Sequence, residues 1–125
     1  MSRDYTRLSD EKLVELYQKT RVEVGETDID DPKHGDLVVE SGRIAAALKS
    51  RGDNSLAKLL PLLDDQSASV RIETAHNCLD LARDRCIAVI QSLLFDNNRY
   101  VAALAGLYLI QNAPALARQV VGKTS

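Results

Sequence analysis

Apolar residues recur along this chain at the spacing of amphipathic helices, and short polar runs separate them. Leu13, Leu16 and Tyr17 share one face of a predicted helix over residues 9–24, which Ser9 or Asp10 can cap. Similar patterns predict further helices over residues 36–51, 56–63, 69–82, 86–95, 99–111 and 114–121. The sequence therefore predicts an all-α protein of about seven helices.

One block of residues repeats along the chain. Leu62–Asp65 recurs as Leu93–Asp96, 31 positions later (93 − 62 = 31), and Val70 falls on Val101 at the same offset. A period of this size is typical of stacked helical hairpins, in which one hairpin cannot bury its own apolar face alone. The clearest copies cover residues 55–82 and 86–111.

Residues 56–82 resemble a HEAT repeat, which has a Leu-rich first helix, an Asp at the turn, and Val-Arg, a small residue and Leu on its second helix. The residues that fill the last five places are Asp64 or Asp65, Val70, Arg71, Ala75 and Leu79. Residues 87–110 depart from the pattern where Val101-Ala102 replaces the Val-Arg pair, and residues 1–51 match in outline. The whole chain is similar to short bacterial HEAT-like proteins classed as a domain of unknown function.

This resemblance implies one domain over residues 1–125. It would be a short right-handed α-solenoid of about three hairpins plus a short C-terminal helix. The resemblance also implies a binding surface, but no activity.

Composition narrows the function classes. The 125 residues suit one domain, and the net charge of −2 disfavours non-specific nucleic-acid binding, which needs a positive field. No apolar stretch suggests a signal peptide or a membrane span, so we expect a cytoplasmic protein. Cys78 and Cys86 are too few for a disulfide framework, and we expect buried, reduced thiols and no cofactor.

An acidic segment, residues 25–35, contains two glycines and a proline, and we expect it to form a long insertion loop. Three interpretations remain open for its carboxylates, including Asp28, Asp30 and Asp31: a solvated insertion, a metal site, or an interaction loop. The Asp-Ile-Asp-Asp-Pro order over residues 28–32 breaks the ligand spacing of a calcium loop, so no metal site is predicted. A solvated insertion is the default, and because long loops in compact domains often carry function, an interaction loop is favoured over a metal site.

The second helix of each hairpin lines the concave face of a stack of this kind. The outward residues of those helices are expected to be Glu40, Arg43, Glu73, His76, Asn77, Asp80 and Arg99. The set is polar and slightly acidic, and it offers no aromatic platform for nucleotide bases. It suits a polar or basic protein partner, and an ordinary solvated surface is the alternative.

Residues Val101–Ile110 carry no charge. A helix that is apolar all round must be covered all round, either by its own chain or by a second subunit. A homodimer through this helix is therefore the alternative to burial within one chain.

Two classes of function follow from these patterns. The first is a non-enzymatic protein-binding module that uses the concave face, the acidic loop or both, with an immunity-type inhibitor of a basic toxin as a variant. The second is an accessory lyase or other enzyme of HEAT-like build, which would need a reactive Cys78 or Cys86 or a placed carboxylate. The sequence favours the first.

Overall fold

The computed structural model describes residues 4–124, and this part of the chain is entirely helical, without a strand. It contains seven α-helices and two 3₁₀ helices. In chain order these are η1 (Tyr5–Arg7), α1 (Asp10–Glu26), α2 (Pro32–Ser50), α3 (Asp53–Leu56), η2 (Ala57–Asp64), α4 (Ala68–Asn77), α5 (Arg83–Ser92), α6 (Arg99–Asn112) and α7 (Pro114–Thr124). The predicted all-α class is confirmed.

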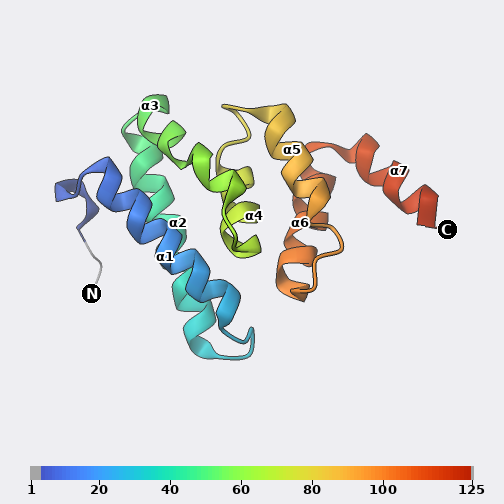
Figure 1. Ribbon diagram of the computed structural model, residues 1–125, viewed down its shortest axis with the longest axis horizontal. Helices are drawn as coiled ribbons and strands as arrows, with labels where there is room; N and C mark the ends of the chain where they lie inside the picture. Colours follow the sequence, from blue (N-terminus) through green and yellow to red (C-terminus); the bar gives the residue numbers. More distant parts are fainter. Residues whose placement is uncertain (1–3, 125) are drawn as a thin grey trace.

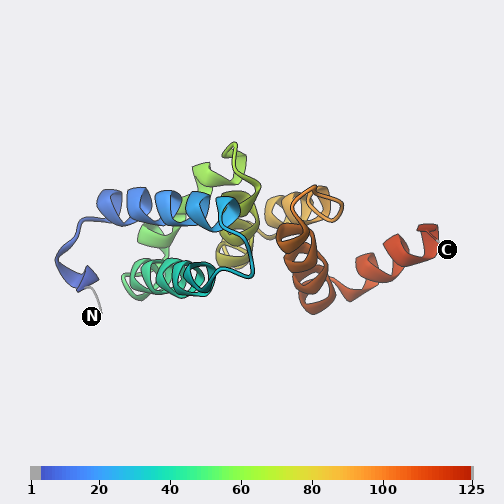
Figure 2. The same ribbon diagram turned by 90° about the horizontal axis from the view of Figure 1, so that it is seen from below.

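The helices pack as sequential pairs. Helix α1 packs on α2, η2 on α4, and α5 on α6, and α4 also contacts α1 and α6 (Figure 1). Seen from below, α1 and α5 lie on one side of the row, while α2 and α6 lie on the other (Figure 2). Helix α4 therefore joins the first pair to the last.

Side-chain caps fix where most of these helices begin. The Ser9 hydroxyl accepts a hydrogen bond from the Lys12 amide at the start of α1, and Ser67 does the same for Val70 at the start of α4. Asn98 caps α6 by accepting from the amides of its first turn. Each cap satisfies a backbone N–H that has no partner inside its own helix.

The long acidic loop over residues 25–35 was a wrong prediction. Helix α1 continues through Gly25 to Glu26, and α2 already begins at Pro32, so the connection is only residues 27–31. Gly25 lies inside the helix, and a residue without a side chain suits this position because an added Cβ would meet the Ser69 Cβ at 3.0 Å. Pro32 starts a helix here because its fixed φ suits the first turn, which Asp31 caps.

The helices over residues 57–82 also differ from those predicted. Residues 57–64 form a 3₁₀ helix that contains Pro61, since proline cannot supply the amide that a regular α-helix requires. Helix α4 ends at Asn77 instead of continuing to Ala82. Val39 on α2 is 53% exposed, although its side chain is apolar.

The centre of the molecule between η2, α4 and α5 is aliphatic. Six of its buried residues, called here the aliphatic cluster, are Leu59, Leu63, Ile72, Cys78, Cys86 and Ile90. Both cysteines are free and buried, as expected. Burial of these side chains is the main stabilising contribution in this region.

Helix α6 is only partly covered by the described chain. Val101, Ala105, Tyr108 and Leu109 are buried, whereas Ile110 is 61% exposed. The chain does not complete the cover because α7 leads away from the other helices (Figures 1 and 2). No helix among the described residues is long and apolar enough to span a membrane.

Candidate functional site: a groove between α2, α4 and α6

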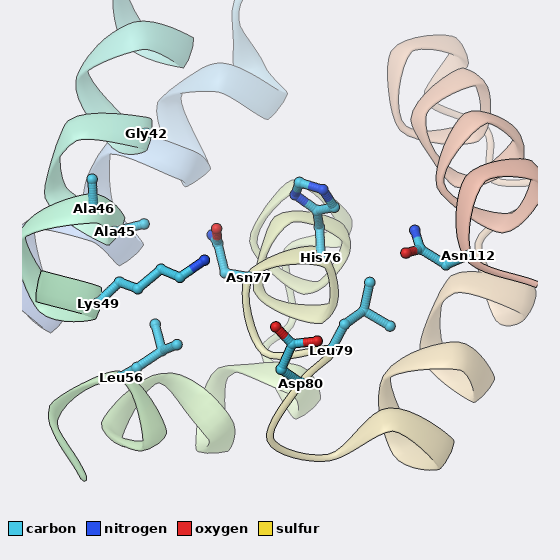
Figure 3. A pocket seen from close by; sticks show the side chains of 10 residues that line it. All are labelled: Gly42, Ala45, Ala46, Lys49, Leu56, His76, Asn77, Leu79, Asp80 and Asn112. Atoms are coloured by element: carbon cyan, nitrogen blue, oxygen red, sulfur yellow. The ribbon is translucent and has the colours of Figure 1, made fainter. Parts of the chain in front are cut away.

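A groove of about 350 Å³ runs from α2 across the end of α4 to the end of α6 (Figure 3). The residues that line it are Gly42, Ala45, Ala46, Lys49, Leu56, His76, Asn77, Leu79, Asp80 and Asn112. The α2 wall consists largely of glycine and alanine, so few side-chain atoms fill the space between α2 and α4. A Cβ added at Gly42 would meet nothing within 4 Å.

The groove presents polar groups that have unused hydrogen-bonding capacity. Within residues 4–124, the Lys49 ammonium and the Asp80 carboxylate make no hydrogen bond or ion pair. The Asn112 side chain donates from Nδ2 to the Tyr108 carbonyl at 2.8 Å and keeps its Oδ1 as an acceptor. In Figure 3 the Lys49 side chain extends toward Asn77, and Asn112 faces them from α6.

A fully buried arginine lies behind this groove. Arg21 on α1 is 0% exposed, although it follows the apolar positions Leu13 and Tyr17 along one helix face. Its Nε donates to the Ser69 carbonyl at 3.3 Å and its Nη1 to the Ser41 hydroxyl at 3.3 Å. A charge buried to this degree requires an opposite charge close by.

Glu73 supplies that charge. Its Oε2 lies 3.7 Å from Arg21 Nη2, and its side chain is only 18% exposed. Burial alone would raise the pKa of Glu73. The nearby His76 imidazole, the charge of Arg21 and the Tyr108 hydroxyl outweigh burial and hold that pKa below its usual value. The prediction that Glu73 points outward was wrong, because α4 turns it toward α1.

His76 connects Glu73 to the groove. Its ring stacks on Tyr108 with centroids 4.0 Å apart, and its Nδ1 lies 3.5 Å from Glu73 Oε1. The Tyr108 hydroxyl donates to the Glu73 carboxylate, with its two oxygens at 3.0 and 3.1 Å. Burial and the Glu73 charge raise the pKa of Tyr108, so it remains a donor. We call Arg21, Ser41, Glu73, His76 and Tyr108 the buried polar cluster.

Asn77 is held from the same side. Its Nδ2 donates to the Tyr17 hydroxyl at 3.2 Å, and that hydroxyl also pairs with the Thr74 hydroxyl at 3.2 Å. Tyr17 is fully buried, which raises the pKa of its hydroxyl. Since the Nδ2 end of the Asn77 amide is fixed by this contact, its carbonyl oxygen remains available on the groove side.

The structure brings together three of the expected binding residues and separates the others. His76, Asn77 and Asp80 line the groove, together with Lys49 and Asn112, which sequence reasoning missed. Of the remaining residues expected on that face, Glu40 is partly buried and Arg43 is exposed on α2, outside the groove, and Arg99 lines a different pocket. The sequence did contain a signal that Arg21 is buried, since this charged residue falls within the apolar stripe of the first helix.

The acidic residues near residue 30 have local structural roles. Asp28 accepts from the Asp30 amide at 3.0 Å, and Asp31 accepts from the Lys33 amide at 2.9 Å. All three carboxylates are exposed. Among the described residues, no group of His, Cys, Asp and Glu is arranged to hold a metal ion.

Both thiols are poorly suited to nucleophilic chemistry. Burial raises the pKa of Cys78 to about 12, with a further contribution from Cys86. Burial also raises the pKa of Cys86. Both thiols therefore remain protonated near neutral pH. The thiolate, which is the reactive form, is scarce at both positions.

Comparisons with known proteins do not identify a relative of this chain. Searches of protein-family models, curated proteins and solved structures find no match to this chain. The resemblance of residues 56–82 to a HEAT repeat therefore rests on its own sequence motif.

Proposed function

We propose that this protein is a non-enzymatic interaction module of HEAT-like build, a short right-handed solenoid that binds a segment of another protein. The groove between α2, α4 and the end of α6 is the proposed site. One observation carries the proposal: a groove of about 350 Å³ collects polar groups with unused hydrogen-bonding capacity on a fixed frame.

The chemistry of the groove suits a polypeptide segment. The free oxygens of Asn77 and Asn112 can each accept a backbone N–H, which every non-proline residue of a partner offers. Lys49 and Asp80 supply one charge of each sign, and these can pair with side chains of the bound segment. The small residues Gly42 and Ala46 let a backbone approach α2 closely.

The frame around the groove favours binding without rearrangement. His76 is held by Glu73 and Tyr108, and Asn77 is held by Tyr17, so part of the groove wall is already ordered. A preorganised site loses less conformational entropy when it binds. Within the buried polar cluster only His76 lines the groove, and the other members support the proposed function by holding that wall in place.

A photo-crosslinking experiment tests this proposal. p-Benzoylphenylalanine replaces Ala46 in the groove or Ala88 on α5, since both positions are exposed on helices. The protein is irradiated in lysate of the cells that make it, and adducts are identified by mass spectrometry. We expect a defined protein adduct from position 46 and none of that mass from position 88.

A second arm tests the groove charges. The position-46 crosslinker is combined with Lys49→Glu and Asp80→Lys, which reverse both groove charges at exposed sites, and circular dichroism checks the fold. We expect the adduct to be lost. An adduct that forms equally from position 88, or that survives the double reversal, would place the interaction elsewhere. Glu73 is unsuitable for such a test because it is the ion-pair partner of buried Arg21.

A further inference from the structure

A second pocket, of about 390 Å³, lies apart from the groove and shares none of its lining residues. It is formed by the end of α1, the 27–31 loop and the start of α2 on one side, and by the start of α6 on the other. Among the residues that line it are Asp28, Ile29, His34, Arg99, Tyr100 and Ala103. Its walls are largely apolar, unlike the mixed walls of the groove.

One wall of the pocket carries a largely buried imidazole that makes no hydrogen bond within the described part of the chain. His34 is 5% exposed, and its ring packs edge-on against Tyr100, with centroids 4.6 Å apart. Within residues 4–124 its side chain makes no hydrogen bond or ion pair. Since its nitrogens are not among the fully buried atoms without a partner, the imidazole keeps its hydrogen-bonding capacity on the pocket side for a group of a ligand.

The mouth of the pocket combines an exposed apolar side chain with negative charge. Ile29 in the 27–31 loop is 62% exposed, although it is large and aliphatic. Residues 26–36 contain five carboxylates against a single lysine. Asp28 and Arg99 line the pocket itself with opposite charges, and the segment over residues 26–36 that borders it carries the net negative charge.

The loop that carries Ile29 and Asp28 is held in place. Asp28 accepts from the Asp30 amide, and Asp31 caps α2. On the opposite side, the Asn98 side chain donates to the Gly25 carbonyl at 3.3 Å and ties the start of α6 to the end of α1. Both walls are therefore positioned before anything binds.

We propose that this pocket is a second docking site, for a basic segment of a partner protein. The segment inserts one large apolar side chain between Ile29 and Tyr100, and a backbone group beside that side chain pairs with the His34 imidazole. Basic residues flanking the anchor face the carboxylates of residues 26–36. An apolar anchor within a complementary polar rim is the usual arrangement of a tight protein contact.

Three capped tripeptides are the probes for this site. They are Lys-Phe-Lys, Glu-Phe-Glu and Lys-Gly-Lys, each with an acetylated N-terminus and an amidated C-terminus. Each is titrated into ¹⁵N-labelled protein, and backbone amide shifts are followed by NMR. The first has both anchor and charge, the second reverses the charge, and the third removes the anchor.

We expect Lys-Phe-Lys to shift the amides of Ile29, Tyr100 and Ala103, with the shifts weakened by added salt. Each of the other two peptides should bind at least about ten-fold more weakly, because each lacks one of the two interactions. Absence of shifts at the pocket, or equal binding of Glu-Phe-Glu, would overturn the proposal. Concentration-dependent shifts of the same amides without peptide would assign the pocket to a second copy of the chain and also overturn it.

A pair of matched variants localises the effect. Ala103→Arg places a long cationic side chain at the pocket, whereas Ala88→Arg makes the same change on the exposed surface of α5. Lys-Phe-Lys binding should be lost in the first variant and kept in the second, and the NMR spectra themselves report folding. Equal binding by both variants would overturn the proposal. Ala46→Arg in the groove should leave this binding unchanged, so the two proposed sites can fail independently.

Discussion

The two sides of α4 are stabilised in different ways. Toward η2 and α5, Ile72 packs within the aliphatic cluster, whose members are all buried and apolar. Toward α1 and α6, Glu73 and His76 take part in the buried polar cluster around Arg21. A difference of one residue along the helix therefore separates non-directional packing from specific pairing.

This difference shows why the groove lies beside the polar cluster. Apolar packing fixes volume but tolerates exchange of one shape for another, whereas hydrogen bonds and ion pairs fix the orientation of particular groups. His76 and Asn77, which line the groove, are both held by directional contacts. The following substitutions test this contrast, from the largest expected effect to the smallest.

Arg21→Met should be the most damaging change. It keeps an unbranched side chain of similar length but leaves the buried Glu73 without its arginine partner, which costs about 3–5 kcal/mol. Urea unfolding followed by circular dichroism measures this loss. Arg43→Met, at an exposed position of α2, is the control and should change stability by less than about 0.5 kcal/mol. A loss at Arg21 no larger than the control would show that the pair is not structural.

Ile90→Ala should destabilise the aliphatic cluster by about 2–5 kcal/mol, because it removes buried methyl groups and leaves a cavity. The matched change Ile110→Ala, at a position that is 61% exposed, should cost far less. Both are measured by the same urea unfolding. We expect Ile90→Ala to leave the NMR shifts of His76 and Asn77 nearly unchanged. Arg21→Met should move those shifts. The reverse result would contradict the difference between the aliphatic cluster and the buried polar cluster.

Acid should weaken the polar cluster through Glu73. Its folded pKa is lowered, so the stability it contributes is present above its unfolded pKa and is lost as pH falls through the folded value. The difference in unfolding free energy between wild type and Glu73→Gln should therefore be larger at neutral pH than in acid. Urea titrations across that range measure it, with Glu26→Gln at an exposed site as control. A difference that does not change with pH would rule out this role for the carboxylate.

Gly42→Ala should stabilise the protein slightly, by about 0.5–1 kcal/mol, since alanine favours a helix interior and the new methyl group meets no atom. Gly106→Ala in α6 is the matched control, because it also has open space. Thermal unfolding should show a small rise in Tm for both. A fall in Tm for Gly42→Ala alone would show that a methyl group at this position meets neighbouring atoms, contrary to the open space beside Gly42 in the structure.

Local sequence signals placed most helices but misjudged the segment over residues 25–35. Ser9 was expected as a cap from its position before an apolar stripe, and the structure confirms it. Gly25 and Pro32 were interpreted as breakers, yet one lies within α1 and the other begins α2. The requirement for glycine at position 25 comes from Ser69, which is distant in sequence, so no local pattern could reveal it.

The candidate site was predicted only in part, for a related reason. His76, Asn77 and Asp80 were found because helical spacing places them away from the apolar face of their own hairpin. Lys49 and Asn112 were missed, because their approach to α4 depends on how the hairpins pack on one another. The same packing places Arg99 at the second pocket, beside Asp28.

The sequence by itself determined the all-α class and the starts of most helices, because helix periodicity and capping depend on neighbours within a few positions. It also determined that Cys78 and Cys86 would be buried. The tertiary structure alone decided that Arg21 and Glu73 are buried together, that Asn112 reaches the groove, and that His34 lines a pocket without a partner. These outcomes depend on distances between residues far apart in the chain, and electrostatic and packing energies follow distance in space, not separation in sequence.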